Sequence, residues 1–242
     1  MVWAAILVIG TLAGTLGGVV GFGSSVILLP VLAFAFGPKA AVPIMAVAAL
    51  VGNIARVMVW WREVDWRATL AYSLPAVPAA ALGARTLVAM DGRWIETALG
   101  VFLIAVVPLR RLMAARGWTI GLPGLAVAGA LLGYLTGIVA TTGPVNAPVF
   151  LAYGLVKGAY IATEAASSAA VYVTKTGVFR ALGALPTDIL LQGLLVGCAL
   201  MVGARLAKRL VERLEPGQYR HVMDVLLLFA GTGLLWAAAT TP

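Results

Sequence analysis

The sequence predicts an all-α polytopic membrane protein made of two inverted-topology repeats of about five helical segments each, including short broken half-helices. Composition is the first reason, because 62% of the 242 residues are hydrophobic and only 11% are charged. The second is that apolar runs of about 20 residues, enough to cross a hydrocarbon core of roughly 30 Å, follow one another along nearly the whole chain. The third is that two of these runs are interrupted at matching places, within residues 21–30 and 139–148, which align at one constant offset.

The helical segments follow from the apolar runs that lie between charges and helix breakers. Those of the first half lie near residues 3–20, 24–37, 40–61, 68–89 and 94–113. Those of the second half lie near residues 121–138, 143–156, 158–180, 187–208 and 219–239. The second segment of each half has only about 14 residues, too few to cross the core upright at about 1.5 Å per residue. We therefore expect these two segments to be half-helices or the arms of tilted hairpins.

The order and spacing of the segments predict two transmembrane repeats, residues 1–117 and 118–242. An odd number of crossings in each unit places the second copy upside down in the membrane. Small residues at matching positions support the repeat and also allow close helix packing. The matching glycines are Gly14 and Gly133, Gly18 and Gly137, and, after a small shift in offset, Gly83 and Gly203.

Basic loops predict which end of the bundle faces the cytoplasm. Arginines cluster between residues 110 and 116 and between residues 205 and 220, and tryptophans at residues 60, 61 and 66 read as an interfacial anchor on the same face. The protein is accordingly expected in the inner membrane of the cell as a multi-pass protein. The net charge of +8 reflects this topology signal and implies no nucleic-acid partner.

The two interruptions predict an anion site. Each lies directly before a short helix, and a helix N-terminus carries partial positive charge and free N–H donors. Backbone without helical hydrogen bonds persists inside a membrane only when protein buries it or a wet cavity faces it. Two such termini brought together would form a wet, electropositive pocket near the midplane. The predicted substrate-binding residues are Gly21, Gly23, Ser24 and Ser25 in the first interruption and Thr141, Thr142, Gly143 and Asn146 in the second.

Simpler interpretations of the same residues remain open. The hydroxyls can serve as helix caps and the glycines as packing positions. Asn146, one turn into the second half-helix, either donates to a ligand or bonds to a neighbouring helix.

One predicted segment, residues 158–180, is unusually polar for a span. Glu164, Ser168, Tyr172 and Lys175 lie at helical spacing on one face, which must turn away from lipid because ionised groups are costly there. Ser168, Tyr172 and Lys175 are expected to contact the substrate, and Lys175 would attract an anion. Glu164 is a candidate for proton coupling. The alternatives are a structural ion pair for Glu164 and a lysine that extends to the interface.

Two polar residues in the segment 40–61 complete the candidate site. Asn53 and Arg56 are one turn apart, and the offset of the interruptions pairs Arg56 with Thr174 of the second half. Arg56 either offsets the charge of the substrate or extends to the cytoplasmic interface. Its position a turn from Trp60 favours the interface.

Enzymatic and metal-binding functions find no support in the residues. Cys198 is the only cysteine and His221 the only histidine, so neither a disulfide framework nor a metal centre is expected. No P-loop is present, nor a nucleophile with a base and an orienting acid. We expect no cofactor and no catalytic residue. The expected partners are a small anionic substrate and the lipid bilayer, with the oligomeric state left open.

At the interruptions the chain resembles the TauE/SafE family of sulfite and organosulfonate exporters, also called the toluene sulfonate uptake permease family. Each half of that family carries a pattern close to Gly-x-Gly-Gly-Gly-x-x-x-x-Pro. The first copy is matched by Gly21, Gly23 and Pro30, and the second by Gly143, Pro144 and Pro148. Hydroxyl residues replace several of the glycines, namely Ser24, Ser25, Thr141 and Thr142. Their hydroxyls add hydrogen-bond donors that suit the oxygens of a sulfite or sulfonate.

The resemblance covers essentially the whole chain and implies a secondary transporter. It would export a small sulfur-containing oxyanion by alternating access, with proton coupling through Glu164 as a further hypothesis. An anion channel or an uptake permease on the same scaffold is one alternative. A membrane assembly factor that transports nothing is another.

Overall fold

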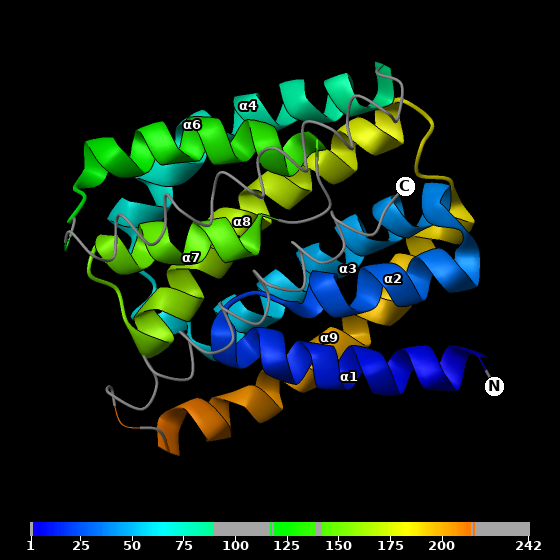
Figure 1. The fold of residues 1–242 in the computed structure, drawn as a ribbon, viewed down its shortest axis with the longest axis horizontal. Helices are drawn as coiled ribbons and strands as arrows, with labels where there is room; N and C mark the ends of the chain where they lie inside the picture. The colour runs from blue at the N-terminus through cyan, green and yellow to red at the C-terminus, as the bar shows by residue number, and fades with distance from the viewer. Residues whose placement is uncertain (1, 90–116, 118, 139–141, 214, 216–242) are drawn as a thin grey trace.

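The computed structural model describes residues 2–89, 117, 119–138, 142–213 and 215, and the regular structure of these residues is helical. The predicted segments near residues 94–113 and 219–239, as well as Thr141, lie outside the described residues. In the first half the helices are α1 (Val2–Val20), α2 (Ser24–Phe36), α3 (Pro38–Val59) and α4 (Trp66–Ala89), with a 3-10 turn η1 (Trp61–Glu63) before α4. In the second half they are α6 (Leu122–Ile138), α7 (Gly143–Ala152), α8 (Lys157–Ala181) and α9 (Thr187–Arg213) (Figure 1).

Two of these helices are short, as the sequence predicts, with 13 residues in α2 and 10 in α7. Helix α2 begins directly after Gly23, whose φ of 101° is a left-handed conformation that glycine adopts without strain. Helix α7 ends at Ala152, earlier than predicted, because the chain turns at Gly154, where φ is 105°. Helix α9 continues to Arg213, later than predicted, because its buried face extends as far as Val211.

Three of the described helices are long and apolar enough to cross a membrane, by length and composition. They comprise residues Val2–Val20, Ala40–Val59 and Thr187–Arg213, each with a mean hydropathy of 1.9 over its best window. Helix α8 is polar by comparison and is largely buried within the bundle. An all-helical, polytopic membrane protein is therefore the architecture of the described chain.

The helices pack around a central pair, α3 and α8 (Figure 1). Helix α9 packs against α1 and α3, and α4 packs against α6 and α8. The two short helices take lateral positions, α2 against α1 and α3, and α7 against α6 and α8. Among these described pairs, the contacts of α1, α2 and α3 thus have counterparts in those of α6, α7 and α8.

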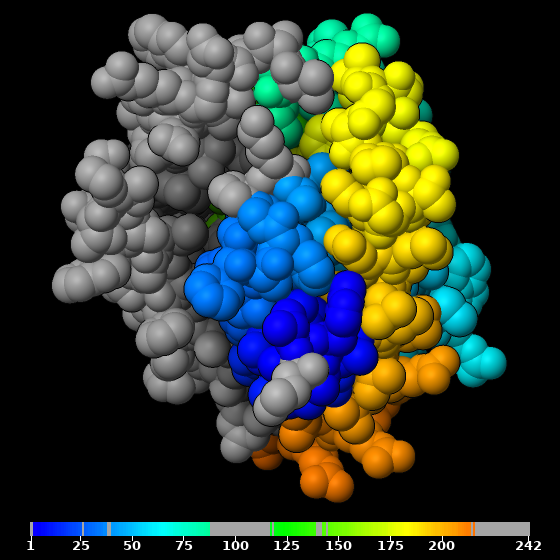
Figure 2. All heavy atoms as spheres, turned by 90° about the vertical axis from the view of Figure 1, so that its right-hand side faces the viewer, coloured from blue at the N-terminus to red at the C-terminus, as the bar shows by residue number. Residues whose placement is uncertain are grey.

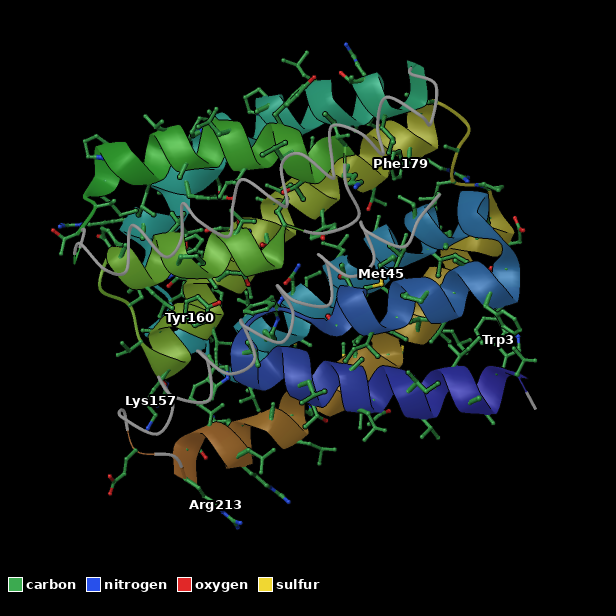
Figure 3. All side chains as sticks on the ribbon, in the orientation of Figure 1. Trp3, Met45, Lys157, Tyr160, Phe179 and Arg213 are labelled. Carbon is green, nitrogen blue, oxygen red and sulfur yellow. The ribbon has the colours of Figure 1, made fainter. Side chains whose placement is uncertain are left out.

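The bundle has two ends, which we name by one residue each. At the Trp60 end, the hydroxyl of Tyr160 donates to the carbonyl of Val20 at 3.1 Å, and the ammonium of Lys208 lies 5.1 Å from the ring centroid of Trp60. The last turns of α1, α3 and α9 therefore meet the first turns of α8 there. Phe179 marks the other end of α8 (Figure 3). Figure 2 views this Phe179 end, where the start of α1 lies beside the end of α8 and the start of α9.

Buried apolar side chains form two clusters, one toward each end. The cluster that contains Trp60 includes Tyr72, Phe150 and Tyr160, and the rings of Tyr72 and Phe150 lie 5.1 Å apart. The cluster that contains Phe179 includes Leu28, Leu32 and Met45.

Glycines let the outer helices approach each other at backbone distance. A methyl group built on Gly133 of α6 would lie 2.6 Å from the Cα atom of Ala76 in α4. One built on Gly14 of α1 would lie 2.7 Å from the Cα atom of Leu200 in α9. Lipid provides no hydrophobic drive for helix association, so such close contacts hold the bundle together.

We expect Gly133→Ala to lower the melting temperature in detergent, because its methyl group meets backbone that has no rotamer to change. Overpacking of this kind costs about 1–3 kcal/mol, more than the gain of about 1 kcal/mol in helix propensity. Gly177→Ala is the matched control, since nothing lies within 4 Å of a methyl group built there. Equal melting temperatures for the two variants would contradict the close contact between α4 and α6.

Candidate functional site

The two interruptions of the backbone lie against each other. Helix α2 starts after Gly23, and α7 starts at Gly143 with a proline in its first turn. The backbone of Gly143 contacts the side chain of Phe22 so closely that a methyl group on Gly143 would overlap it. Two helix N-termini that are far apart in the chain are thus neighbours, and protein surrounds the non-helical backbone between them, as a membrane interior requires.

A small cavity lies where the two interruptions meet. The space that the centre of a water molecule can reach is about 40 Å³, room for roughly three waters at about 10–15 Å³ each. Most of the predicted site residues line it, namely Gly21, Gly23, Ser24, Ser25, Asn53, Arg56, Thr142, Gly143, Asn146, Glu164, Ser168 and Tyr172. Lys175 is not among the lining residues, and Thr141 lies outside the described residues.

An ion pair between α3 and α8 spans the cavity. Nη1 of Arg56 lies 3.3 Å from Oε2 of Glu164, and the two side chains are only 13% and 3% exposed. The guanidinium also donates to the carbonyl of Gly21 and to Oδ1 of Asn53. Extension of Arg56 to the interface, which its position near Trp60 favours, is therefore wrong. Three acceptors inside the bundle hold the side chain, and its departure would leave a buried carboxylate without a cation.

Glu164 is the centre of a wider hydrogen-bond network. Its Oε1 accepts from the hydroxyl of Ser168 at 2.7 Å and from Nδ2 of Asn146 at 3.5 Å. Asn146 in turn accepts from the hydroxyl of Tyr72 at 2.9 Å. Of the alternatives for Glu164, the structural ion pair is present, and Asn146 bonds to neighbouring helices.

The side chains that line the cavity do not make it electropositive. Arg56 and Glu164 are its charged residues among those the structure describes, and their formal charges cancel. The expectation of an electropositive pocket is wrong in this respect, because Glu164 forms an ion pair with Arg56. Positive potential must come instead from the N-termini of α2 and α7.

Lys175 is fully buried but lies outside the cavity. Its ammonium donates to the carbonyl of Thr136 in α6 at 2.8 Å and lies 5.5 Å from the ring centroid of Phe179. The hydroxyl of Thr136 shares a hydrogen bond with the hydroxyl of Thr142, which lines the cavity. Lys175 therefore reaches neither the interface nor the cavity of this structure, and Thr136 connects it to Thr142 of the cavity wall.

Several lining residues were not predicted. They are mainly small residues of α1 and α3, together with Phe22 and two residues of α9, namely Gly14, Gly17, Gly18, Phe22, Ala49, Gly52, Leu200 and Ala204. A signal for α3 exists in the sequence, since Ala49, Gly52 and Arg56 share one helical face. Tyr72 gave none, because its bond to Asn146 depends on how α4 packs in three dimensions.

Comparison with known proteins shows the family of the chain. A family model described as "Sulfite exporter TauE/SafE" matches residues 6–234 of the chain. The match spans nearly the whole chain, as the resemblance at the two interruptions predicts. No curated protein and no solved structure matches the chain.

We predict strong coupling between Arg56 and Glu164 in a double-mutant cycle. Arg56→Met leaves a buried carboxylate without its cation and should lower the melting temperature severely, since loss of one partner of a buried pair costs about 3–5 kcal/mol. The double variant Arg56→Met plus Glu164→Gln should lose less than the sum of the single variants, by about 0.5–3 kcal/mol.

Arg180→Met provides the control, because Arg180 bonds to the carbonyl of Leu185 near the end of α8 rather than to Glu164. Its effect should add to that of Glu164→Gln. Additive effects of Arg56→Met and Glu164→Gln would instead show that the ion pair contributes little.

Proposed function

Because the chain belongs to the TauE/SafE family of sulfite exporters, we propose that it exports a small sulfur-containing oxyanion by alternating access. Membership in this family implies a membrane transporter of sulfite or an organosulfonate, and not an enzyme. The observation that carries the proposal is that both helix interruptions and a buried arginine line one small cavity.

The substrate would be held by groups that favour an oxyanion. The N-termini of α2 and α7 lie at the cavity, and neither has a side-chain cap among the described contacts. The partial positive charge of each terminus favours an anion. In α7 the amides of Val145 and Asn146 bond to the carbonyl of Thr142. Pro144 has no N–H, so this helix contributes through its dipole. Ser25 and Thr142 add buried hydroxyls, and Arg56 adds a guanidinium that matches the geometry of an oxyanion. The small volume of the cavity favours sulfite, or the sulfonate group alone, over a bulky organosulfonate.

Glu164 could make anion binding depend on pH. As a carboxylate it competes with the substrate for Arg56, whose Nη1 lies 3.3 Å away. A proton on Glu164 would remove that competition and release positive charge for an incoming anion. Proton binding and anion binding would then favour each other, which is a form of coupling.

Alternating access follows if the two halves are inverted repeats. The contacts of α1 with α9 and of α3 with α9 are matched by those of α6 with α4 and of α8 with α4. The glycine contacts match as well, because Gly14 of the first half meets Leu200 of the second and Gly133 of the second half meets Ala76 of the first. This packing makes Leu200 the counterpart of Ala76. The match of Gly83 with Gly203 would instead make residue 196 its counterpart, one helical turn earlier.

The cavity lies in the half of the bundle toward the Trp60 end, the end that the basic loops assign to the cytoplasm. It is lined by the last turns of α1 and α3 and by residues 164–172 around the middle of α8. Exchange of conformations between two inverted repeats would close this side and open the other. An inside-negative potential would favour the exit of an anion by about 2.3 kcal/mol per charge per 100 mV.

We expect sulfite to raise the melting temperature of the purified protein more than sulfate, taurine, sulfoacetate or simple carboxylates do. Arg56→Gln should weaken this binding about 10- to 100-fold, the size of a charge-assisted hydrogen bond of about 1.5–3 kcal/mol. Ser25→Leu plus Thr142→Leu should abolish it by filling the cavity. Arg205→Gln, at an exposed position of α9, is the control and should bind sulfite normally. If no oxyanion shifts the melting temperature, a role as an assembly factor gains ground.

Flux across proteoliposomes separates a coupled exporter from a channel. The wild-type protein should move sulfite against its gradient when a proton gradient is imposed, whereas a channel only dissipates the sulfite gradient. Glu164→Gln should retain downhill flux and lose its response to the proton gradient. Equal responses of the wild-type protein and this variant would remove Glu164 from the coupling mechanism.

A further inference from the structure

The helix boundaries place Arg56 and Lys175 at equivalent positions of the two halves. Helix α7 begins 119 residues after α2, at Gly143 against Ser24, and α8 begins 119 residues after α3, at Lys157 against Pro38. Residue 175 is likewise 119 positions after residue 56. Alignment through the interruptions alone has an offset one residue smaller, which pairs Arg56 with Thr174 and conceals the match.

Helix packing supports the larger offset. Gly133 follows Gly14, and Gly137 follows Gly18, by the same 119 residues. Gly133 and Gly137 pack against α4, and Gly14 and Gly18 pack against α9. Helices α4 and α9 are the fourth helices of their halves among those described, so the neighbours are equivalent. The offset of 119 therefore relates α1 and α6 in space as well as along the chain.

The two cations also make similar contacts, to carbonyls that differ by one helical turn on this offset. Arg56 of α3 donates to the carbonyl of Gly21, directly after α1, the first helix of its half. Lys175 of α8 donates at 2.8 Å to the carbonyl of Thr136, in the last turn of α6, the first helix of the other half. In each half, then, a cation from the third helix meets the carbonyl end of the first helix, where the helix dipole favours positive charge.

The two cations differ in access to the cavity. Arg56 lines it, whereas Lys175 is fully buried about one turn beyond Tyr172, the last residue of α8 that lines it. The remainder of α8 leads to Phe179 and the end of the bundle opposite Lys157 (Figure 3). Lys175 bonds to the carbonyl of Thr136, whose hydroxyl bonds to that of Thr142, a residue of the cavity wall.

We propose that Lys175 is the second anion-binding cation of the transport path, the counterpart of Arg56 for the opposite side of the membrane. When the cavity opens toward the Phe179 end, Lys175 faces the small oxyanion and Arg56 is enclosed, as Lys175 is enclosed here. The substrate passes from Arg56 to Lys175 through the partition at Thr136 and Thr142. This inference rests on the proposed transport function and adds the place of the second site.

Thiol labelling from each face of the membrane tests the proposal. In a Cys198→Ser background, Arg56→Cys and Lys175→Cys are treated with an anionic, membrane-impermeant thiosulfonate in intact cells and in inverted membrane vesicles. Arg56→Cys should react mainly from the cytoplasmic face and Lys175→Cys mainly from the external face. Ala165→Cys, a fully buried position of α8 outside the cavity, is the control that should not react.

Charge variants give a second readout that needs no cysteine. Lys175→Gln should slow sulfite exchange across vesicles about tenfold or more, the effect of losing one charge-assisted hydrogen bond. Lys175→Arg keeps the charge and should retain most of the exchange. A purely structural lysine would instead lower the melting temperature in both variants without a difference in exchange.

The proposal is overturned if Lys175→Cys reacts from the same face as Arg56→Cys, or from neither face while sulfite flux continues. The proposed function fails separately. If labelling follows the expected two-sided pattern but sulfite is neither bound nor moved, the paired cations stand and the assignment of the substrate is wrong.

Discussion

Lipid offers the backbone no hydrogen-bond partner, and this constraint organises the molecule. Helix α1 stops at Val20 and α2 begins at Ser24, so carbonyls and amides at depth lose their helical partners. Each would cost several kcal/mol in hydrocarbon. The fold answers by bringing both interruptions together, where Arg56 bonds the carbonyl of Gly21 and a small cavity faces the N-termini of α2 and α7. Groups that solvate broken backbone are thereby also placed to solvate an anion.

Convergence of the interruptions depends on helices that approach each other closely. Gly14 and Gly18 of α1 serve both needs, because they contact α9 at backbone distance and also line the cavity. Their α9 neighbours, Leu200 and Ala204, line the cavity as well. A larger residue on α1 would both push α9 away and fill the site. Packing and ligand access are therefore controlled by the same positions, which explains why glycines recur on this face rather than all around the helix.

The sequence predicts the helical segments and the interruptions well, because apolar length and the conformational preferences of glycine and proline are local properties. It predicts the direction of Arg56 wrongly, because its acid, Glu164, lies 108 residues away and no local pattern reveals it. Helical spacing places Lys175 on the same face as Tyr172, but spacing does not say where the cavity ends along that face. The offset of the interruptions likewise pairs Arg56 with Thr174, whereas the starts of the packed helices pair it with Lys175.

Chemical symmetry between the halves breaks at Glu164. With the offset that pairs Arg56 with Lys175, its equivalent is Met45, a fully buried apolar residue of α3. A carrier with the same residues on both sides would bind its substrate alike from either face. Here the carboxylate beside Arg56 belongs to one half, so on the proposed mechanism the proton concentration on the side of Arg56 would control binding there. Direction of net flux still follows the gradients of substrate, proton and potential, because a difference in affinity between two faces cannot by itself drive transport. The asymmetry instead selects which of the two faces senses the proton.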